Sequence, residues 1–531
     1  MPDHAVNRQF DFLVVGGGAS GAVLARRLAE RTGYSVALLE AGSSDRHVPE
    51  IADFRRYQDV IAGPHAKNFV AMSGGAGGHL VNIPTGRVLG GSTSLNTCIW
   101  LRPPAHDFAA WRQSGASGWS DDAVTDAFRQ VEQQIRFETV RSENPAQRAL
   151  LDAARELDFQ EIDFTEPFDA GIGRYRFNTA GYSRQSSAVA FLHDTTPLVS
   201  NLKIFTDTEV ERLLIDAGHR VTGVQTNRGI FEARYETILC AGAINTPKIM
   251  LLSGLGPGSD LQALGIQVFR ELAGVGRHLL DHPAVALNLA ASREPPRAEP
   301  WNYAGILFAR TDATAPWPDI EIQLGAELFQ KHAIAAGYTG HDGPGFCAYL
   351  TVNRACSEGS VTLRSPRADE APLIDLAYFS DPRGEDMRVM ADGLKLSRRL
   401  FATRAMQSWI AGEVTPGASA MDGEGLADYI RRTATTGYHL AGTCRMGDRT
   451  APGSVVGSDL KVIGVEGLRI ADASIFPTMV SVNIAPTCWM IGQRAADIIR
   501  ACWSGQAIPS SVRSSPSSSP SFAPINSKES A

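Results

Sequence analysis

The first forty residues alternate between apolar and polar stretches in an order that predicts a strand, a helix and a second strand. Residues 10–15 form a short, mostly apolar run, as a buried parallel strand does. A glycine turn follows, then an amphipathic stretch from Ser20 to about Arg31, and a second apolar run from Ser35 to Glu40. This order predicts one strand–helix–strand unit at the start of the chain.

Farther along, the periodicity of the sequence changes twice. Residues 42–120 are rich in glycine and loop-forming residues, and helical patterns return at about 121–136 and 146–156. From 200 to 240 the pattern alternates as antiparallel strands do. Residues 386–406 are predicted to form one amphipathic helix of about five turns. The last residues, 506–531, are rich in Ser and Pro and are predicted to be disordered.

Composition narrows the class of protein. The chain has 531 residues, 44% hydrophobic and 20% charged, which predicts a globular protein of two packed domains. Its net charge is −7, and without a long basic run neither nucleic acid nor an anionic membrane surface is an expected partner. No run reaches the ~18–20 apolar residues of a transmembrane span. The N-terminus has no apolar signal-peptide stretch, so we expect a cytoplasmic protein.

The cysteines and histidines give little sign of a metal. The seven cysteines are odd in number and form no CxxC pair, which favours free, packed thiols over a disulfide framework or a zinc site. His278 and His282 would lie on one side of a helix, a spacing that metal ligands use. We favour a structural or cofactor-proximal role for this segment, and we expect no metal. No Gly-x-Ser-x-Gly motif is present, which weakens a serine-hydrolase interpretation.

The glycine turn after the first strand has the pattern of a dinucleotide-binding site. Gly16, Gly18 and Gly21 match G-x-G-x-x-G between a predicted strand and a predicted helix. The first glycine permits a tight turn, the second lets backbone amides approach a pyrophosphate, and the third lets helix and strand pack closely. Glu40, at the end of the next strand, would accept hydrogen bonds from ribose hydroxyls. This pattern predicts FAD or NAD without separating the two.

Four further segments share one family resemblance: Gly86–Asn96 followed by Trp100, Gly242–Gly256, Tyr438–Gly447, and Ala471–Ser474 followed by Asn483. Together they resemble the signatures of the glucose–methanol–choline (GMC) oxidoreductases, and within that family the choline-oxidising members. The resemblance covers about residues 10–503. It implies an α/β FAD-binding, Rossmann-like domain and an α+β substrate domain built on an antiparallel sheet. We assign 1–155, 200–285 and 438–505 to the FAD-binding domain, and 156–199 and 286–437 to the substrate-binding domain.

The resemblance also implies which residues bind FAD. Asn96 would hold the pyrimidine side of the flavin, and Asp472 would orient its ribityl–phosphate region. The turn at Gly91 and Ser92 offers amides and a hydroxyl to the cofactor. The full implied cofactor set is Gly16, Gly18, Ala19, Ser20, Gly21, Glu40, Ala41, Arg87, Leu89, Gly91, Ser92, Asn96, Val210, Ala241, Asp472 and Ala473.

His439 and Asn483 fall where the family has its catalytic His–Asn pair. Oxidation of an alcohol removes a hydride from carbon and a proton from oxygen, so a base must accept the proton. Histidine suits that task because its pKa lies near the operating pH. An amide can hold the alcohol oxygen so that the C–H bond points at flavin N5. We therefore expect His439 to be the base and Asn483 the orienting group.

Departures from the choline-oxidising relatives concern the flavin tether and the substrate. One of those relatives attaches FAD through a histidine just before the asparagine of the first signature, where this chain has Leu95, so we predict non-covalent FAD. By rough alignment Tyr303 and Gln323 replace the glutamate and histidine that face the substrate. Tyr303, with Trp301, could still contact a cation through its ring, whereas Gln323 suits a neutral hydroxylated substrate. Both are predicted to determine specificity.

The sequence thus predicts FAD-dependent oxidation of a small primary or secondary alcohol to an aldehyde or ketone. The electron acceptor would be O2 or a quinone-type molecule, and a homo-oligomer is left open. Two rivals remain: a lyase of the hydroxynitrile lyase type, which keeps FAD without net redox chemistry, and a flavin-binding protein without catalysis.

Overall fold

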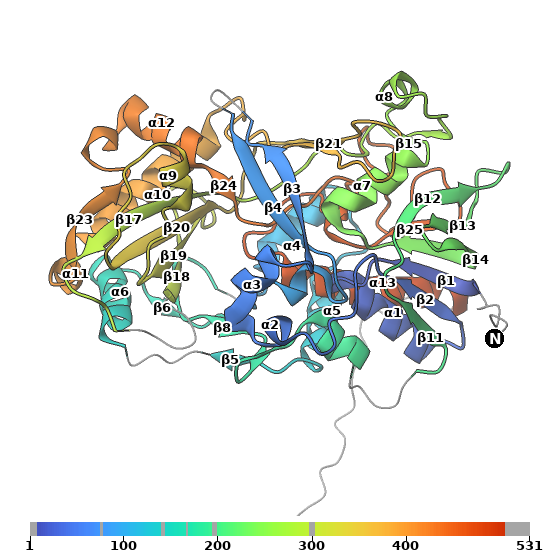
Figure 1. Ribbon diagram of the computed structural model, residues 1–531, viewed down its shortest axis with the longest axis horizontal. Coiled ribbons are helices and arrows are strands. Elements are labelled where there is room, and N and C mark those ends of the chain that lie inside the picture. The colour runs from blue at the N-terminus through green and yellow to red at the C-terminus, as the bar shows by residue number, and fades with distance from the viewer. Residues whose placement is uncertain are drawn as a thin grey trace, which may run out of the picture.

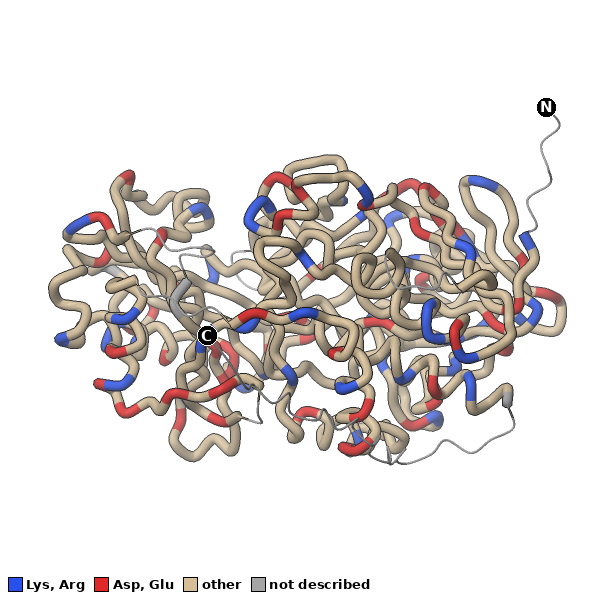
Figure 2. The backbone as a smooth tube through the Cα atoms, turned by 90° about the horizontal axis from the view of Figure 1, so that it is seen from below, with Lys and Arg blue, Asp and Glu red and all other residues tan. Residues whose placement is uncertain are grey.

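The computed structural model describes residues 8–74, 78–139, 144–165, 168–193, 199–296 and 303–504. The chain folds into two bodies, each built on a large β-sheet, with a β-ribbon rising between them (Figure 1). The predicted disordered tail, 506–531, lies outside the described residues. Lys and Arg positions are interspersed with Asp and Glu positions along the backbone (Figure 2). In the described ranges, no helix combines the length and the apolarity needed to cross a membrane.

The first body contains the predicted strand–helix–strand unit. Strand β1 (Gln9–Val15) pairs in parallel with β2 (Val36–Leu39), and α1 (Ala19–Arg31) connects them. All four residues of β2 are buried, as expected of a strand covered on both faces. The neighbours along this sheet are β11 (Leu202–Phe205), β14 (Gly229–Leu239), β13 (Val221–Thr226), β12 (Val210–Ile215) and β25 (Leu468–Ile470).

The strands predicted between 200 and 240 divide between two modes of pairing. Strands β12, β13 and β14 form the predicted antiparallel meander, whereas β11 pairs in parallel with β2 at the far edge. Helix α1 packs against α13 (Ala485–Ser504), which also packs against α5 (Asp121–Glu132). The Ser20 hydroxyl, at the start of α1, donates to the carbonyl of Cys488 at 2.7 Å. The C-terminal helix is therefore fixed to the first βαβ unit.

The second body is a mostly antiparallel sheet covered by helices on one side (Figure 1). Ile320, Ile322 and Leu324 pack into the helix-covered core, so alternate residues of that strand point to the opposite face. The strand order is β23 (Ile410–Thr415), β17 (Pro283–Ala291), β20 (Gly345–Val352), β19 (Ile320–Gly325), β18 (Tyr303–Ala309), β7 (Gly171–Gly173) and β6 (Glu161–Ile162), with β24 (Thr435–Thr436) pairing β17.

The helices of this body are α6 (Pro145–Glu156), α9 (Lys331–Ala335), α10 (Glu385–Phe401), α11 (Arg404–Gln407) and α12 (Gly423–Thr433). The single helix predicted over 386–406 is in fact two helices, because the backbone of Thr403 is extended and its hydroxyl bonds to the carbonyl of Leu400. Helix α6 lies within the range that we assigned to the first domain, yet it packs on β18, α10 and α11.

The ribbon between the two bodies is made of β3 (Ala66–Met72) and β4 (Leu80–Gly86), and β3 also pairs with β22 (Leu373–Asp375), beside β21 (Ser360–Thr362). Short elements complete the chain: α2 (Pro49–Ala52), α3 (Tyr57–Ala62), α4 (Ala105–Gln113), β5 (Glu138–Thr139), β8 (Arg176–Phe177), β9 (Thr179–Ala180), β10 (Ser183–Arg184), α7 (Gly242–Leu252), β15 (Leu255–Gly256), α8 (Gly258–Ala263) and β16 (Arg270–Glu271).

Candidate active site

A cavity of about 1090 Å³ lies between the two bodies. On the first body it is lined by residues at the carboxyl ends of β1, β2, β14 and β25, which meet at one edge of the sheet. In open α/β sheets this edge is where ligands bind. On the second body it is lined by residues of β19 and β20 and by the segment around His439. A single cavity therefore joins the predicted cofactor site to the predicted base.

The glycine turn forms a cradle at the start of α1. Gly16 has φ +103°, which favours glycine, and a Cβ at Gly21 would lie 1.9 Å from the carbonyl oxygen of Gly16. Gly18 is the N-cap of α1 and no side chain caps the helix, so the first-turn amides are open toward the cavity. Uncapped amides at a helix N-terminus bind phosphate groups.

Glu40 lies at the end of β2 and lines the cavity. Its Oε2 accepts a hydrogen bond from the amide of Gly17, and its Oε1 accepts one from the amide of Gly42, both at 2.8 Å. Burial raises the pKa of Glu40 to about 7, and the two amides oppose that shift. Each carboxylate oxygen can accept more than one hydrogen bond, so Glu40 both braces the turn and remains available to a ligand hydroxyl.

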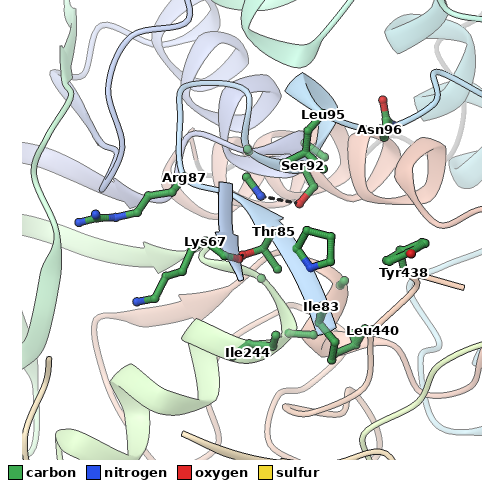
Figure 3. Close-up of a pocket in the computed structure, with 18 of the residues that line it drawn as sticks. Lys67, Ile83, Thr85, Arg87, Ser92, Leu95, Asn96, Ile244, Tyr438 and Leu440 are labelled. Atoms are coloured by element: carbon green, nitrogen blue, oxygen red, sulfur yellow. Dashed lines mark hydrogen bonds between the residues drawn. The ribbon is translucent and has the colours of Figure 1, made fainter. Parts of the chain in front are cut away.

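A second group of charged residues lines the cavity beside the ribbon. Arg87 forms an ion pair with Glu209 at 2.7 Å, and Lys67 lies 4.0 Å from the same carboxylate. In Figure 3 the side chains of Arg87 and Lys67 extend to the side away from Asn96. Arg87 was expected here from its motif, whereas Lys67 and Glu209 were not, because no motif or spacing connects positions so far apart in the chain.

The turn of the first signature also lines the cavity. Ser92 Oγ accepts a hydrogen bond from the amide of Gly86 at 3.1 Å (Figure 3). Arg184 is buried behind this turn and donates to Asn96 Oδ1 at 2.9 Å, which fixes the amide of that side chain. Leu95 also lines the cavity. Leu89 does not line it; its side chain is buried beneath the glycine turn, where it would lie 2.8 Å from a Cβ at Gly17.

Asp472, which follows β25, is buried at the cavity and holds the start of the segment Gly242–Gly256 in place. Its Oδ2 accepts from the amide of Gly242 at 2.8 Å and from the hydroxyl of Thr246 at 2.6 Å. Its Oδ1 accepts from the amide and the hydroxyl of Ser474. Burial raises the pKa of Asp472, and these hydrogen bonds oppose the shift. Thr246 therefore acts through Asp472.

His439 and Asn483 come together in the cavity although 44 residues separate them. Asn483 Nδ2 lies 3.2 Å from His439 Nε2, and His439 Nδ1 lies 2.8 Å from Nδ1 of His282. His282 Nε2 lies 2.9 Å from the carbonyl oxygen of Val480. Burial lowers the pKa of His282 to about 4. Burial also lowers the pKa of His439 well below its ordinary value, and the adjacent His282 adds to the effect.

These contacts determine which nitrogen of His439 carries the proton. A carbonyl oxygen only accepts, so His282 Nε2 must donate to Val480, and neutral His282 then has a bare Nδ1. His439 Nδ1 must therefore donate to His282. Neutral His439 is left with a lone pair on Nε2, the nitrogen beside Asn483. The base is thus held in the form that can accept a proton.

Neighbouring groups hold the two catalytic candidates in place. Asp281 accepts from the amide of His439 at 2.9 Å and from the hydroxyl of Tyr378, and burial raises the pKa of Asp281 to about 6. The segment 278–282 is not helical: Leu279 and Leu280 form bridges to other segments. Within the described residues, no three His, Cys, Asp or Glu side chains gather as a metal site.

The wall opposite the cofactor side belongs to the second sheet. Gln323 on β19 and Tyr349 and Thr351 on β20 line the cavity, as does Tyr438, the residue before His439. Tyr303 is the first residue of β18. Its side chain and all of Trp301 lie outside the described part of the chain.

Most of the residues singled out from the sequence line this one cavity. They are Gly16, Gly18, Ala19, Ser20, Glu40, Ala41, Arg87, Gly91, Ser92, Asn96, Val210, Ala241, Gln323, His439, Asp472, Ala473 and Asn483. Gly21 and Leu89 are not among its lining residues.

Family models and known proteins match this chain over most of its length. Residues 10–284 match the N-terminal family model described as GMC oxidoreductase, and residues 355–492 match the C-terminal one. The chain is 35% identical to choline oxidase from Arthrobacter globiformis over 94% of this chain and 96% of that protein. It is 30% identical to an oxygen-dependent choline dehydrogenase from Rhizobium rhizogenes over 92% and 95% of the two chains. Pyridoxine 4-oxidase from Mesorbium loti has a TM-score of 0.85 at 25% identity, covering 92% of this chain and 98% of that one.

Proposed function

Because this chain belongs to the GMC oxidoreductase family, we propose that it oxidises a small primary or secondary alcohol to the aldehyde or ketone, with His439 as the base. Its relatives are FAD-dependent oxidoreductases that act on CH–OH donors, and it is an enzyme of that class. The observation that supports the proposal best is the lone pair on His439 Nε2, beside the amide of Asn483.

The cavity fits the cofactor of this family, FAD. The open amides at the N-terminus of α1 suit the pyrophosphate, and the carboxylate of Glu40 suits ribose hydroxyls. Asn96 is fixed by Arg184 at the cavity wall, where it would hold the flavin ring. Leu95 lines the same wall and has no nucleophilic atom, so we propose that FAD is bound without a covalent bond to this position.

The chain's own residues then divide the reaction between them. An alcohol oxygen placed between His439 Nε2 and Asn483 Nδ2 donates its proton to the histidine and accepts a hydrogen bond from the amide. The depressed pKa of His439 keeps the imidazole neutral and ready to accept that proton. FAD, when bound, supplies the acceptor for the hydride that leaves the carbinol carbon. Loss of the proton and the hydride leaves the carbonyl product.

An anaerobic absorbance scan of the holoenzyme with a panel of alcohols tests the proposal. We expect at least one alcohol to bleach the flavin band and the His439→Ala variant to slow bleaching by about 10²–10⁴-fold. His219→Ala, an exposed histidine in the turn between β12 and β13, is the matched control. Release of a carbonyl product from a cyanohydrin without bleaching would instead support a lyase. If no alcohol bleaches the flavin, the proposal is wrong.

Readmission of air then identifies the electron acceptor. Fast recovery of the flavin band with hydrogen peroxide would indicate an oxidase, whereas slow recovery that a quinone accelerates would indicate a dehydrogenase. We propose O2 or a quinone-type molecule as the acceptor and a cytoplasmic location.

A further inference from the structure

One strand of the second sheet places a buried carboxylate directly behind the cavity wall. Glu321 and Gln323 are two residues apart on β19, so their side chains point to the same face of the sheet. Gln323 lines the cavity, whereas Glu321 is 1% exposed and is not among the lining residues. Gln323 Nε2 donates a hydrogen bond to Glu321 Oε1 at 2.8 Å. Glu321 is therefore one hydrogen bond away from the cavity.

This pair sets which end of the Gln323 amide is available to a ligand. An ionised carboxylate only accepts hydrogen bonds, so the amide must turn its NH2 group toward Glu321. The carbonyl oxygen of Gln323 is then the free end, and no group in the described ranges donates to it. Burial raises the pKa of Glu321 to about 7, and the hydrogen bond from Gln323 opposes the shift. Above that pH the carboxylate is ionised and holds the amide in this orientation.

Gln323 is far enough from His439 to contact the other end of a substrate. Strands β19, β20, β17 and β24 are successive neighbours, so three strand spacings, about 14 Å in total, separate the backbones of β19 and β24. Tyr349, opposite Gln323 on β20, donates through its hydroxyl to the carbonyl of Thr436, three residues before His439. The side chains of Gln323 and His439 both line the cavity, so a small molecule can contact the two together.

We propose that Glu321 is a positioning residue that turns Gln323 Oε1 toward the substrate, so that the site selects alcohols with a second hydrogen-bond donor. This donor is an O–H or N–H group at the end of the molecule away from the hydroxyl that is oxidised. The inference rests on the proposed alcohol oxidation. An analogue that lacks the donor leaves the carbonyl oxygen of Gln323 unpaired, which lowers kcat/KM by roughly 10- to 100-fold.

Two matched pairs of alcohols test the selection. Trimethylene glycol and its monomethyl ether differ in one neutral O–H, and protonated dimethylethanolamine and choline differ in one N–H. The assay is anaerobic flavin reduction in the holoenzyme at about pH 8, above the pKa of Glu321. We expect the donor-bearing member of each pair to react at least about tenfold faster per equivalent hydroxyl.

Two variants then connect this ratio to the pair on β19. Gln323→Leu removes the acceptor and should bring both ratios close to one. In the Glu321→Gln variant the new amide at position 321 can either accept or donate a hydrogen bond, so the amide of Gln323 loses its fixed orientation. The ratio of the two rates in each pair of alcohols should then fall at least about threefold, while FAD stays bound. Glu271→Gln makes the same change on β16, outside the cavity, and should leave the ratio at the wild-type value.

The outcomes separate the two proposals. If alcohols reduce the flavin but the wild-type ratios are close to one, the inference about Gln323 is wrong and the proposed function stands. An unchanged ratio in folded Glu321→Gln would overturn the role of Glu321, and an unchanged ratio in Gln323→Leu would overturn the role of both residues. If no alcohol reduces the flavin, the proposed function and this inference fail together.

Discussion

The contact between the two histidines gives the sharpest prediction. His439 Nδ1 donates to His282 Nδ1 at 2.8 Å, and this bond leaves Nε2 of His439 free to accept a proton. His282→Leu removes the acceptor and leaves a buried N–H without a partner, at a cost of about 1–3 kcal/mol. The imidazole of His439 can then pair its N–H group only by moving the proton from Nδ1 to Nε2. That tautomer is inactive, because Nε2 must be unprotonated to accept the proton of the alcohol. Since 1.36 kcal/mol is a factor of ten in rate, flavin reduction should slow roughly 10- to 100-fold.

His282→Asn is the matched variant, because its side-chain oxygen occupies the place of Nδ1 and can accept from His439. The asparagine variant should recover most of the rate lost in the leucine variant. The measurement is stopped-flow flavin reduction under anaerobic conditions, with FAD content and melting temperature recorded for each protein. Equal losses in the two variants would mean that His282 matters for packing alone. An unchanged rate in His282→Leu would refute the tautomer argument.

Three further predictions follow from the same geometry. Burial lowers the pKa of His282 from about 6.5 to about 4, so between these pH values the unfolded chain binds a proton that the folded chain does not. Protonation of His282 in the unfolded chain should therefore lower the free energy of unfolding by about 3 kcal/mol as the pH falls from 6.5 to 4. Urea unfolding should show that the His282→Asn variant loses less stability than the wild type over this pH range. With Leu95 at the cavity wall, acid precipitation should release all the FAD into the supernatant, and yellow colour in the washed pellet would contradict non-covalent binding. Asp107 accepts hydrogen bonds from both the amide and the hydroxyl of Ser481. The Asp107→Asn variant should therefore have a free energy of unfolding lower by about 1–3 kcal/mol and should reduce its flavin more slowly. An unchanged rate of flavin reduction in variant protein that urea unfolding shows to be folded would refute the role of Asp107 in the site.

The first body was predictable from local patterns because each of its signals is short and contiguous. Burial on both faces makes β1 and β2 nearly continuous apolar runs, and the glycine turn between them requires particular residues. The helix over 386–406 was predicted too long, because amphipathic periodicity continues through Thr403 although the backbone there is extended. Helix α6 packs on β18, α10 and α11 although its range was assigned to the first domain, since periodicity shows that a helix has an apolar face and does not show what covers it.

In the candidate site, too, residues inside contiguous motifs were predictable, whereas partners far apart in the sequence were not. Residues inside motifs, such as His439 and Asp472, were identified from sequence and line the cavity. Glu321 and His282 were missed as partners, because a hydrogen bond across strands or between distant loops leaves no periodic trace in the sequence. Position 323 was singled out as polar, but the orientation of its amide depends on a buried neighbour that only the structure shows.

The loop that carries Asn483 shows how an irregular segment can hold a reacting group. Three ring N–H groups donate to carbonyls of the loop, and one carboxylate accepts from it: His278 to Pro477, Trp111 to Thr478, His282 to Val480, and Asp107 from Ser481. A displacement of about 1 Å at a reacting group can cost 10²-fold in rate, so such bracing is needed where no helix or strand supplies it. His282 belongs to this set and also orients His439. The side chain of His282 thus couples the base to the amide, whereas the hydrogen bond of Trp111 goes to the loop alone. Replacing Trp111 should therefore disturb the position of Asn483 and leave the tautomer of His439 intact.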